Sequence, residues 1–375
     1  MNTKDAPFVD IHTHRQCEGA MTYGIHPWTL DDPVIARSIN DEAIQKEFFG
    51  EEHPYIATSY NNIGYIYENM GDYSNSLSYL QKAMLIREKV LSSHHPDLAV
   101  TYVNIGFTYS RLGEYTKGLN YMLKALEIFT ITFGEEHLDV ATCLHNIGMM
   151  YMYLENDDLA LEYSMKALNI REKLLETTHR DLNTSYNNLG VIYFRKREFE
   201  KSIEYFQKAL QSHILLFGEN HPDVAITCGN IGAVYDAQKN YQKALEYYSR
   251  SLNIQKGILD NNHPDLAGNY NKMGAVYTEM GDYENAWDCL NKALKIWQSS
   301  IGENHPIIAG CYTNLGHYYI VQNDYKNAEA YYSLALEIYA TVFGESHPKT
   351  IKIQQKIAEI QAKLKEQENE KKQNQ

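Results

Sequence analysis

The chain has 375 residues, of which 44% are hydrophobic, and a formal net charge of −14. A hydrophobic fraction of that size is normal for a folded protein and excludes a chain that is disordered throughout. The acidic excess argues against nucleic acid as a partner, because binding phosphates requires a basic face. The five cysteines are scattered without paired spacing, which predicts buried thiols in a reducing compartment.

No apolar run reaches the roughly 18–20 residues that a membrane-spanning helix requires, so we expect no membrane insertion. The first residues lack the basic start and continuous apolar stretch of a secretion signal. These features predict a cytoplasmic protein.

The first segment, residues 1–34, fits neither a complete domain nor the repeats that follow. Residues 8–14 read as a short strand that ends in His-x-His, and His26 follows. This pattern resembles the opening of TatD-like metal-dependent hydrolases. The resemblance implies that His12 and His14 are metal ligands, with His26 as a candidate third. The other strands of a barrel of about 250 residues have no counterpart, so we expect a vestigial or fused fragment and no bound metal or cofactor.

Residues 35–52 are expected to form a capping half-repeat. Residues 43–54 match the closing half of the repeats described next, for example residues 126–137. A helix with this pattern would cover the first repeat of the array.

Histidine recurs with a period of 42 residues along the rest of the chain, and most of these histidines are followed by proline. They are His53, His95, His137, His179, His221, His263, His305 and His347. A fixed period of about 20–50 residues is the signature of a solenoid, in which each repeat packs only against its neighbours. Equivalent residues of adjacent repeats stand at least about 8–10 Å apart, whereas zinc ligands lie within roughly 2.1 Å of the metal. We therefore expect these histidines to cap helices rather than bind metal.

The first repeat, residues 53–94, reads as two helices joined by a turn. Apolar residues recur at spacings of three and four from Ile56 to Met70 and again from Leu77 to Val90. Gly71 stands where the first helix must end. Mid-helix glycines recur in all seven repeats at a cost of up to about 1 kcal/mol each against alanine, so we expect close helix contacts there. They are Gly64, Gly106, Gly148, Gly190, Gly232, Gly274 and Gly316.

The first repeat also carries a spaced signature of aromatic, aliphatic and small residues. The residues are Tyr60, Ile63, Gly64, Tyr67, Gly71, Tyr73, Ser76, Tyr79 and Ala83. In this signature, residues 53–348 resemble seven tetratricopeptide repeats. The period exceeds the usual ~34 residues by about two helical turns, which is similar to the kinesin light chain class. The resemblance implies an all-α, right-handed superhelical α-solenoid of helix-turn-helix repeats with half-helix caps.

Two repeats depart from the pattern. Leu138 replaces the proline and Glu155 the turn glycine in the third repeat, and Arg180 and Arg197 do so in the fourth. We expect these repeats to be the softer joints of the array.

After Pro348, residues 349–364 are predicted to form a capping helix. Ile353, Ile357, Ile360 and Leu364 give it one apolar stripe. Residues 365–375 are wholly polar and are predicted to be a disordered tail. A short coiled coil is the alternative, but fewer than two heptads make it marginal.

The candidate binding residues lie two positions before the mid-helix glycines. Asparagine occupies this position in six of seven repeats, although it is a poor mid-helix residue. The residues are Asn62, Asn104, Asn146, Asn188, Asn230, Lys272 and Asn314. In one interpretation the amides bond neighbouring helices and fix their stacking. In the other they line a concave groove, as the matching position does in tetratricopeptide proteins, and bond the backbone of an extended peptide.

Residues further along the same helices would give the groove its character. Arg111, Tyr153, Phe194 and Arg195 combine arginine with aromatic residues in repeats two to four, whereas Asp236 and Glu279 make the later repeats acidic. Our hypothesis is a partner segment that carries acidic and aromatic residues. The alternative is a solvated face of incidental composition.

The predicted function is therefore that of a non-enzymatic scaffold that holds an extended segment of a partner protein. Two alternatives remain open. One is a metal-dependent hydrolase-like N-terminus carried on the array, and the other is a structural protein whose repeats stack end to end. The oligomeric state is left open.

Overall fold

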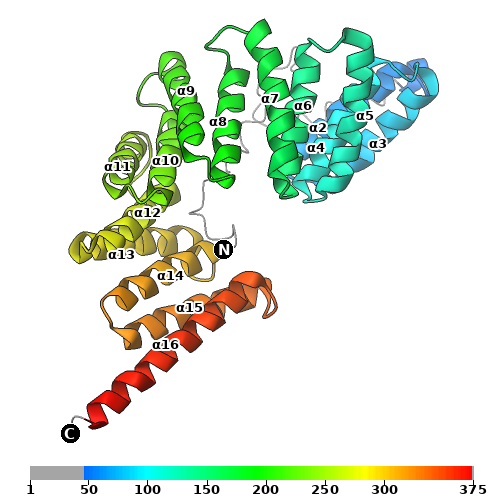
Figure 1. The fold of residues 1–375 in the computed structure, drawn as a ribbon. Coiled ribbons are helices and arrows are strands. Elements are labelled where there is room, and N and C mark those ends of the chain that lie inside the picture. The colour runs from blue at the N-terminus through cyan, green and yellow to red at the C-terminus, as the bar shows by residue number, and fades with distance from the viewer. Residues whose placement is uncertain (1–45, 374–375) are drawn as a thin grey trace. The chain divides into compact units, whose positions relative to one another are not determined.

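The computed structural model describes residues 46–373. The predictions for residues 1–34, and for most of the half-repeat at 35–52, lie outside this range, although residues 46–49 are helical. The labelled helices (Figure 1) are α2 (Pro54–Asn69), α3 (Tyr73–Val90), α4 (Pro96–Arg111), α5 (Tyr115–Phe133), α6 (Leu138–Tyr153), α7 (Asp157–Leu174), α8 (Arg180–Arg195), α9 (Phe199–Phe217), α10 (Pro222–Ala237), α11 (Tyr241–Ile258), α12 (Pro264–Met280), α13 (Tyr283–Ile301), α14 (Pro306–Val321), α15 (Tyr325–Phe343) and α16 (Pro348–Gln373).

The helices fall into two compact units. The described part of the N-terminal unit covers residues 46–212, and that of the C-terminal unit covers residues 213–373. Each unit consists of consecutive helix-turn-helix pairs, and α2 to α15 form seven such pairs in all within residues 46–373. The all-α repeat fold predicted from the 42-residue period is confirmed.

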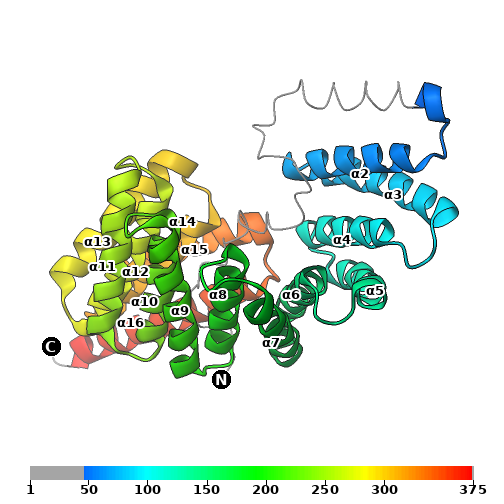
Figure 2. The ribbon, with the colours of Figure 1, turned by 90° about the horizontal axis from the view of Figure 1, so that it is seen from above.

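The first helices of successive pairs form one layer of each unit. In the N-terminal unit α2 contacts α4 and α6 contacts α8, and in the C-terminal unit α12 contacts α14. Figure 2 shows α2 and α4 side by side. The second helices α3, α5, α7, α11 and α13 pack mainly against the first helices on either side of them. The first helices therefore approach one another more closely than the second helices do.

The periodic histidines begin the first helices, as predicted. His53 has an extended backbone at the N-cap of α2, and its Nδ1 accepts the N–H of Tyr55 at 3.2 Å. The same bond recurs at all eight periodic histidines, with N···N distances of 3.1–3.3 Å. It satisfies one of the backbone donors that a helix N-terminus leaves free. His137 and His179 make it without a following proline, so repeats three and four keep their helix starts.

The mid-helix glycines lie where the two helices of a pair touch. A Cβ added at Gly106 would stand 2.9 Å from the backbone oxygen of Gly118, and one at Gly190 would stand 2.7 Å from the ring of Phe206. Six alanines that recur in the second helices are also fully buried, and Ala83 packs with Ile56, Ala57 and Tyr60 of α2. They are Ala83, Ala125, Ala167, Ala209, Ala293 and Ala335. The predicted close approach is confirmed.

The turn after each first helix requires one residue in the left-handed region. Glycine fills this position three times, as at Gly113 with a φ of 77°. In the other four turns a residue other than glycine has a φ of 59–61°: Glu155, Arg197, Lys239 and Asn323. The turn geometry is thus preserved at the cost of backbone strain. The departures from glycine at Glu155 and Arg197 were expected from the repeat pattern, and those at Lys239 and Asn323 were not.

Replacing Arg197 with glycine is expected to stabilise the N-terminal unit. The left-handed conformation costs an L-residue about 1–2 kcal/mol, and the greater freedom of glycine in the unfolded chain offsets part of the gain. We expect a net increase of about 1 kcal/mol, measured as a higher urea midpoint and slower amide exchange in α8 and α9. Arg197→Ala is the control, because alanine keeps the strain. A gain from alanine as large as that from glycine would contradict this explanation.

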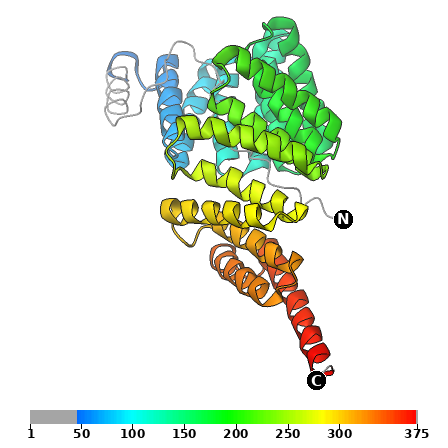
Figure 3. The same cartoon turned by 90° about the vertical axis from the view of Figure 1, so that its left-hand side faces the viewer.

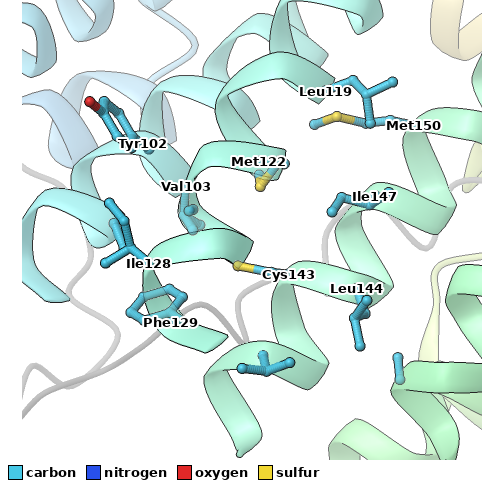
Figure 4. Close-up of a cluster of buried hydrophobic side chains, with 14 of the residues drawn as sticks. Tyr102, Val103, Leu119, Met122, Ile128, Phe129, Cys143, Leu144, Ile147 and Met150 are labelled. Carbon is cyan, nitrogen blue, oxygen red and sulfur yellow. The ribbon is translucent and has the colours of Figure 1, made fainter. Parts of the chain in front are cut away.

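The core between α4, α5 and α6 illustrates how adjacent pairs join (Figure 4). Met122 and Phe129 of α5 and Ile147 of α6 are at most 1% exposed. Cys143 of α6 is also buried there, and burial raises the pKa of its thiol, which keeps it protonated. The three other cysteines of the described residues are likewise buried and unpaired, which confirms the expectation of buried thiols.

The last helix differs from its prediction. α16 packs on α15 through the predicted stripe, in which Ile353 and Ile360 are 5% and 2% exposed. It does not end at Leu364 but continues to Gln373, so residues 365–373 are helical rather than a disordered tail. Figure 3 shows α16 extending beyond α15. Lysine, glutamate and glutamine are good helix formers, and i,i+3 ion pairs such as Lys363–Glu366 support the exposed turns.

Candidate peptide-binding face of the first helices

The candidate residues lie on the first helices of the two units. We call the side of these helices that carries the periodic asparagines the asparagine face. Residues three and four apart share a helix face, so the residues one turn after each asparagine belong to it too.

Three of the asparagines tie one first helix to the preceding one. Asn104 Nδ2 donates to Asn61 Oδ1 at 3.1 Å, and Asn314 Nδ2 donates to Asn271 Oδ1 at 3.0 Å. Asn188 Nδ2 lies 3.0 Å from His145 Nε2. Each bond spans 43 residues, from one first helix to the one before it. The amides at these positions therefore stabilise the stacking of adjacent repeats.

The asparagines differ in their access to a ligand. Asn188 and Asn230 are 5% and 1% exposed. Their side chains are therefore buried, whereas the groove hypothesis requires them on the surface. Asn104, Asn146 and Asn314 are half-buried, and Asn62 is exposed. Of the six, Asn62 and Asn146 best fit a role in binding.

Arg111 is held by its own protein. Its Nε lies 3.5 Å from Glu68 Oε1, and its guanidinium lies 5.8 Å from the centre of the Tyr73 ring. Burial raises the pKa of Glu68, and the charge of Arg111 acts in the opposite direction. An acidic group of a partner would therefore have to share Arg111 with Glu68.

Arg195 and Tyr153 are likewise engaged by neighbouring side chains. Arg195 Nε donates to Asp157 Oδ1 at 2.6 Å, and 31% of the Arg195 side chain and 25% of the Asp157 side chain remain exposed. The ring of Tyr153 stacks on that of Tyr115, with centroids 4.7 Å apart and an interplanar angle of 7°. Both side chains remain partly exposed, and their contacts with Asp157 and Tyr115 hold them in a fixed orientation.

The prediction that Phe194 lines the binding face is wrong. Its side chain is 3% exposed and lies 6.0 Å, centroid to centroid, from Phe199 at the start of α9. Phe194 therefore packs in the turn of its own repeat instead of lining a groove. The position one residue later, Arg195, is the one that reaches the surface.

Sequence reasoning missed the acceptors of the asparagine bonds. Asn61 and His145 each precede a periodic asparagine in their own repeat, and Asn271 precedes Lys272, which takes the place of that asparagine. A search for polar pairs at a spacing of 43 residues, one more than the period, would have found them. The same spacing joins Glu68 to Arg111.

The metal candidates His12, His14 and His26 lie outside the described residues, so the hydrolase-like alternative stays a prediction. Within residues 46–373 no group of three or more His, Cys, Asp and Glu side chains is placed to hold a metal ion. Across the same range, every helix is too short or too polar to cross a bilayer.

Comparisons with solved structures extend the fold assignment. A protein of Podosopora anserina with nearly identical, kinesin light chain-like TPR repeats is 19% identical, with 56% of this chain and 99% of that one covered and a TM-score of 0.50. Aspartyl phosphate phosphatase F from Bacillus subtilis is 15% identical, with 92% and 96% covered and a TM-score of 0.55. A signal transduction ATPase with a tetratricopeptide repeat sensor from Pyrococcus horikoshii is 19% identical, with 83% and 47% covered and a TM-score of 0.61. At these identities the likeness shows the fold alone.

No curated protein matches the chain. The family model of the tetratricopeptide repeat, in contrast, matches residues 55–117, 97–173, 181–257, 265–339 and 312–370, well over half of the sequence. Repeats of this family generally mediate contacts between proteins. The chain belongs to the tetratricopeptide repeat family.

Proposed function

We propose that this protein is a scaffold whose asparagine face binds an extended segment of a partner protein. The observation that carries the proposal is the exposed end of this face in the N-terminal unit. Tyr65 is 39% exposed on α2, one turn after the exposed Asn62. An exposed aromatic ring beside an amide offers an apolar anchor together with a hydrogen-bond donor and acceptor for a peptide backbone.

The layer of first helices supplies a surface that is formed before the partner arrives. The bond from Asn104 to Asn61 joins α4 to α2, and the bond from Asn188 to His145 joins α8 to α6. A rigid surface loses little conformational freedom on binding, so the ordering cost falls mainly on the partner segment. Function thus depends on two kinds of asparagine: those that hold the layer together and those that face the ligand.

Further along the N-terminal unit, the face favours acidic and aromatic groups. Arg111 and Arg195 keep 34% and 31% of their side chains exposed, although each has a carboxylate partner. A carboxylate of the partner segment can bond the remaining guanidinium donors, of which arginine has five. Stacked Tyr115 and Tyr153 offer a ring surface close to the end of α6.

Selection from a displayed library of random 12-residue peptides tests the proposal. We expect the protein to enrich peptides whose binding falls by about tenfold or more in the double variant Asn62→Ala, Tyr65→Ala, because truncating a central aromatic anchor commonly costs over 1–2 kcal/mol. Asn188 is left unchanged, since its amide fixes the contact between α6 and α8.

The matched control is Leu85→Ala on α3, a second helix, where the side chain is 63% exposed. Circular dichroism and urea unfolding should show that both variants fold like the parent. Peptides that bind all three proteins equally would move binding off the asparagine face and make its amides purely structural. Failure to enrich any peptide would remove the proposed function.

A further inference from the structure

Four aromatic side chains of the C-terminal unit meet where α13 packs against α14. Tyr283 and Trp287 belong to the first two turns of α13, and Tyr318 and Tyr319 belong to the last turn of α14. The ring centroid of Trp287 lies 5.7 Å from that of Tyr318 and 6.0 Å from that of Tyr319. The ring of Tyr283 lies 6.0 Å from that of Tyr318. We call these four side chains the aromatic patch.

The outer rings of the aromatic patch are open to solvent. Trp287 is 37% exposed, Tyr283 is 36% exposed and Tyr319 is half-buried, whereas Tyr318 is buried between them and the core. Three of the ring pairs are nearly perpendicular, with interplanar angles of 75–86°. A ring that meets its neighbour edge-on keeps its own negative face free for another group. The exposed rings therefore remain available to a ligand.

The aromatic patch occupies a junction that is mostly aliphatic in the other repeats. The residues that correspond to Trp287 are Leu77, Leu119, Leu161, Ile203, Leu245 and Glu329. At the equivalent junction of the N-terminal unit, Leu119 and Met150 pack in one buried cluster. The stacking of repeats therefore does not require an indole at position 287. An exposed tryptophan is instead typical of the residues that contribute most to protein interfaces.

Lysines cover tyrosine rings at one of these positions in other repeats. In three repeats a lysine lies over the tyrosine eight residues before it, with Nζ 5.0–5.4 Å from the ring centre. The pairs are Tyr109–Lys117, Tyr193–Lys201 and Tyr235–Lys243. Tyr319 occupies the same repeat position, but Asn327 replaces the lysine, and its amide donates to Asp324 at 2.6 Å. Within residues 46–373, no lysine or arginine lies over the four rings of the aromatic patch.

The charge beside the aromatic patch is negative. Residues 281–290 contain three acidic residues and no basic one. Asp282 caps α13 and Asp288 pairs with Lys292, whereas Glu284 is exposed and has no ion pair within residues 46–373. Glu284 lies one turn before Trp287 on α13, and residues three apart share a helix face. An unpaired carboxylate therefore accompanies the exposed indole.

We propose that the aromatic patch binds a basic side chain, a lysine or arginine of a partner protein. The cation lies over the free faces of Trp287 and Tyr319, as lysines of the chain itself do over the corresponding tyrosines, and Glu284 supplies the opposite charge. Tryptophan is the best aromatic side chain for this interaction. The proposal goes beyond the asparagine face, because Tyr283 and Trp287 belong to a second helix. It gives the C-terminal unit an interaction surface of its own.

A direct test titrates the whole protein with Nα-acetyllysine amide and follows the indole ¹H–¹⁵N resonance of Trp287, assigned from its loss in Trp287→Phe. We expect a saturable shift, while the resonance of Trp297, which is 6% exposed, stays in place. Nα,Nε-diacetyllysine amide has no charge and should bind about three- to tenfold more weakly. No saturable shift, or equal binding of the two compounds, overturns the proposal.

A second variant uses the lysine that other repeats carry. Asn327→Lys places a lysine eight residues after Tyr319, where it should cover that ring and weaken the binding of Nα-acetyllysine amide about fivefold. The matched control is Asn75→Lys at the same position of the first repeat, because Asn75 and Asn327 make the same bond, to Asp72 and Asp324. Circular dichroism and urea unfolding should show that both variants fold like the parent. Unchanged binding in Asn327→Lys, or an equal loss in Asn75→Lys, would contradict the proposal. Neither measurement involves the asparagine face, so the proposed function is tested separately.

Discussion

Gly106→Ala is expected to destabilise the N-terminal unit by about 2 kcal/mol, although alanine is the better helix former by about 1 kcal/mol. The added Cβ would lie 2.9 Å from the backbone oxygen of Gly118 and 3.1 Å from Met122. The two helices meet backbone to backbone, because a Cβ at Gly118 would in turn lie 2.7 Å from the oxygen of Gly106. Since neither backbone can rotate away, α4 and α5 must separate, and overpacking of this kind costs about 1–3 kcal/mol or more.

Gly268→Ala is the matched control for this prediction. Gly268 also lies within a first helix, α12, but an added Cβ meets nothing within 4 Å. Here only helix propensity changes, so we expect a gain of about 0.5–1 kcal/mol. Urea unfolding and amide exchange in each helix pair measure both effects. If Gly106→Ala proved as stabilising as Gly268→Ala, the mid-helix glycines would have no role in packing.

Asn183→Ala is expected to stabilise the protein by about 1–3 kcal/mol, the cost of burying a polar group without a partner. Asn183 of α8 is 1% exposed, and within residues 46–373 neither its Nδ2 nor its Oδ1 has a hydrogen-bond partner. The equivalent residue of the six other repeats is a fully buried alanine. These alanines are Ala57, Ala99, Ala141, Ala225, Ala267 and Ala309. Alanine at 183 therefore fits a space that the fold already provides.

The reverse exchange provides the control. Ala141→Asn in α6 introduces the same amide into an equivalent site and is expected to lower stability by a similar amount. The stability of both variants is measured by the urea midpoint and by amide exchange in α6 to α9. A loss of stability in Asn183→Ala would show that the amide is bonded in solution, and the residue would then join the polar contacts that hold the repeats together.

The architecture could be predicted because each repeat signals its own boundaries. The cap at His53, the turn at Gly71 and the close contact at Gly64 each rest on local chemistry that recurs every 42 residues. Caps and turns depend on residues only a few positions apart. The same cap and turn residues recur in seven repeats, so each repeat supports the same prediction. The end of α16 was mispredicted because a polar helix and a polar tail have similar composition, and the helix depends on i,i+3 ion pairs and on packing against α15.

The candidate site was less predictable, because its residues act across repeats. Asn188 was expected on the surface, yet it is buried against His145. Arg111 was expected to be available to a ligand, yet it is paired with Glu68. Phe194 and Arg195 are sequence neighbours, but one packs inward and the other outward. Burial at these positions depends on the helix 43 residues away, which the periodicity of a single repeat does not specify.

The way α16 binds has a consequence for engineering arrays of different length. α16 follows His347 as a first helix follows its histidine cap, and its Ile353 and Ile360 cover the side of α15 that a further repeat would need. Its other side is lined mainly with lysine, glutamate and glutamine, and Ile351, which is 40% exposed, offers little apolar surface for another helix pair. A designed chain is therefore lengthened by inserting whole 42-residue blocks ahead of His347, so that α16 remains the terminal helix, rather than by adding them after it.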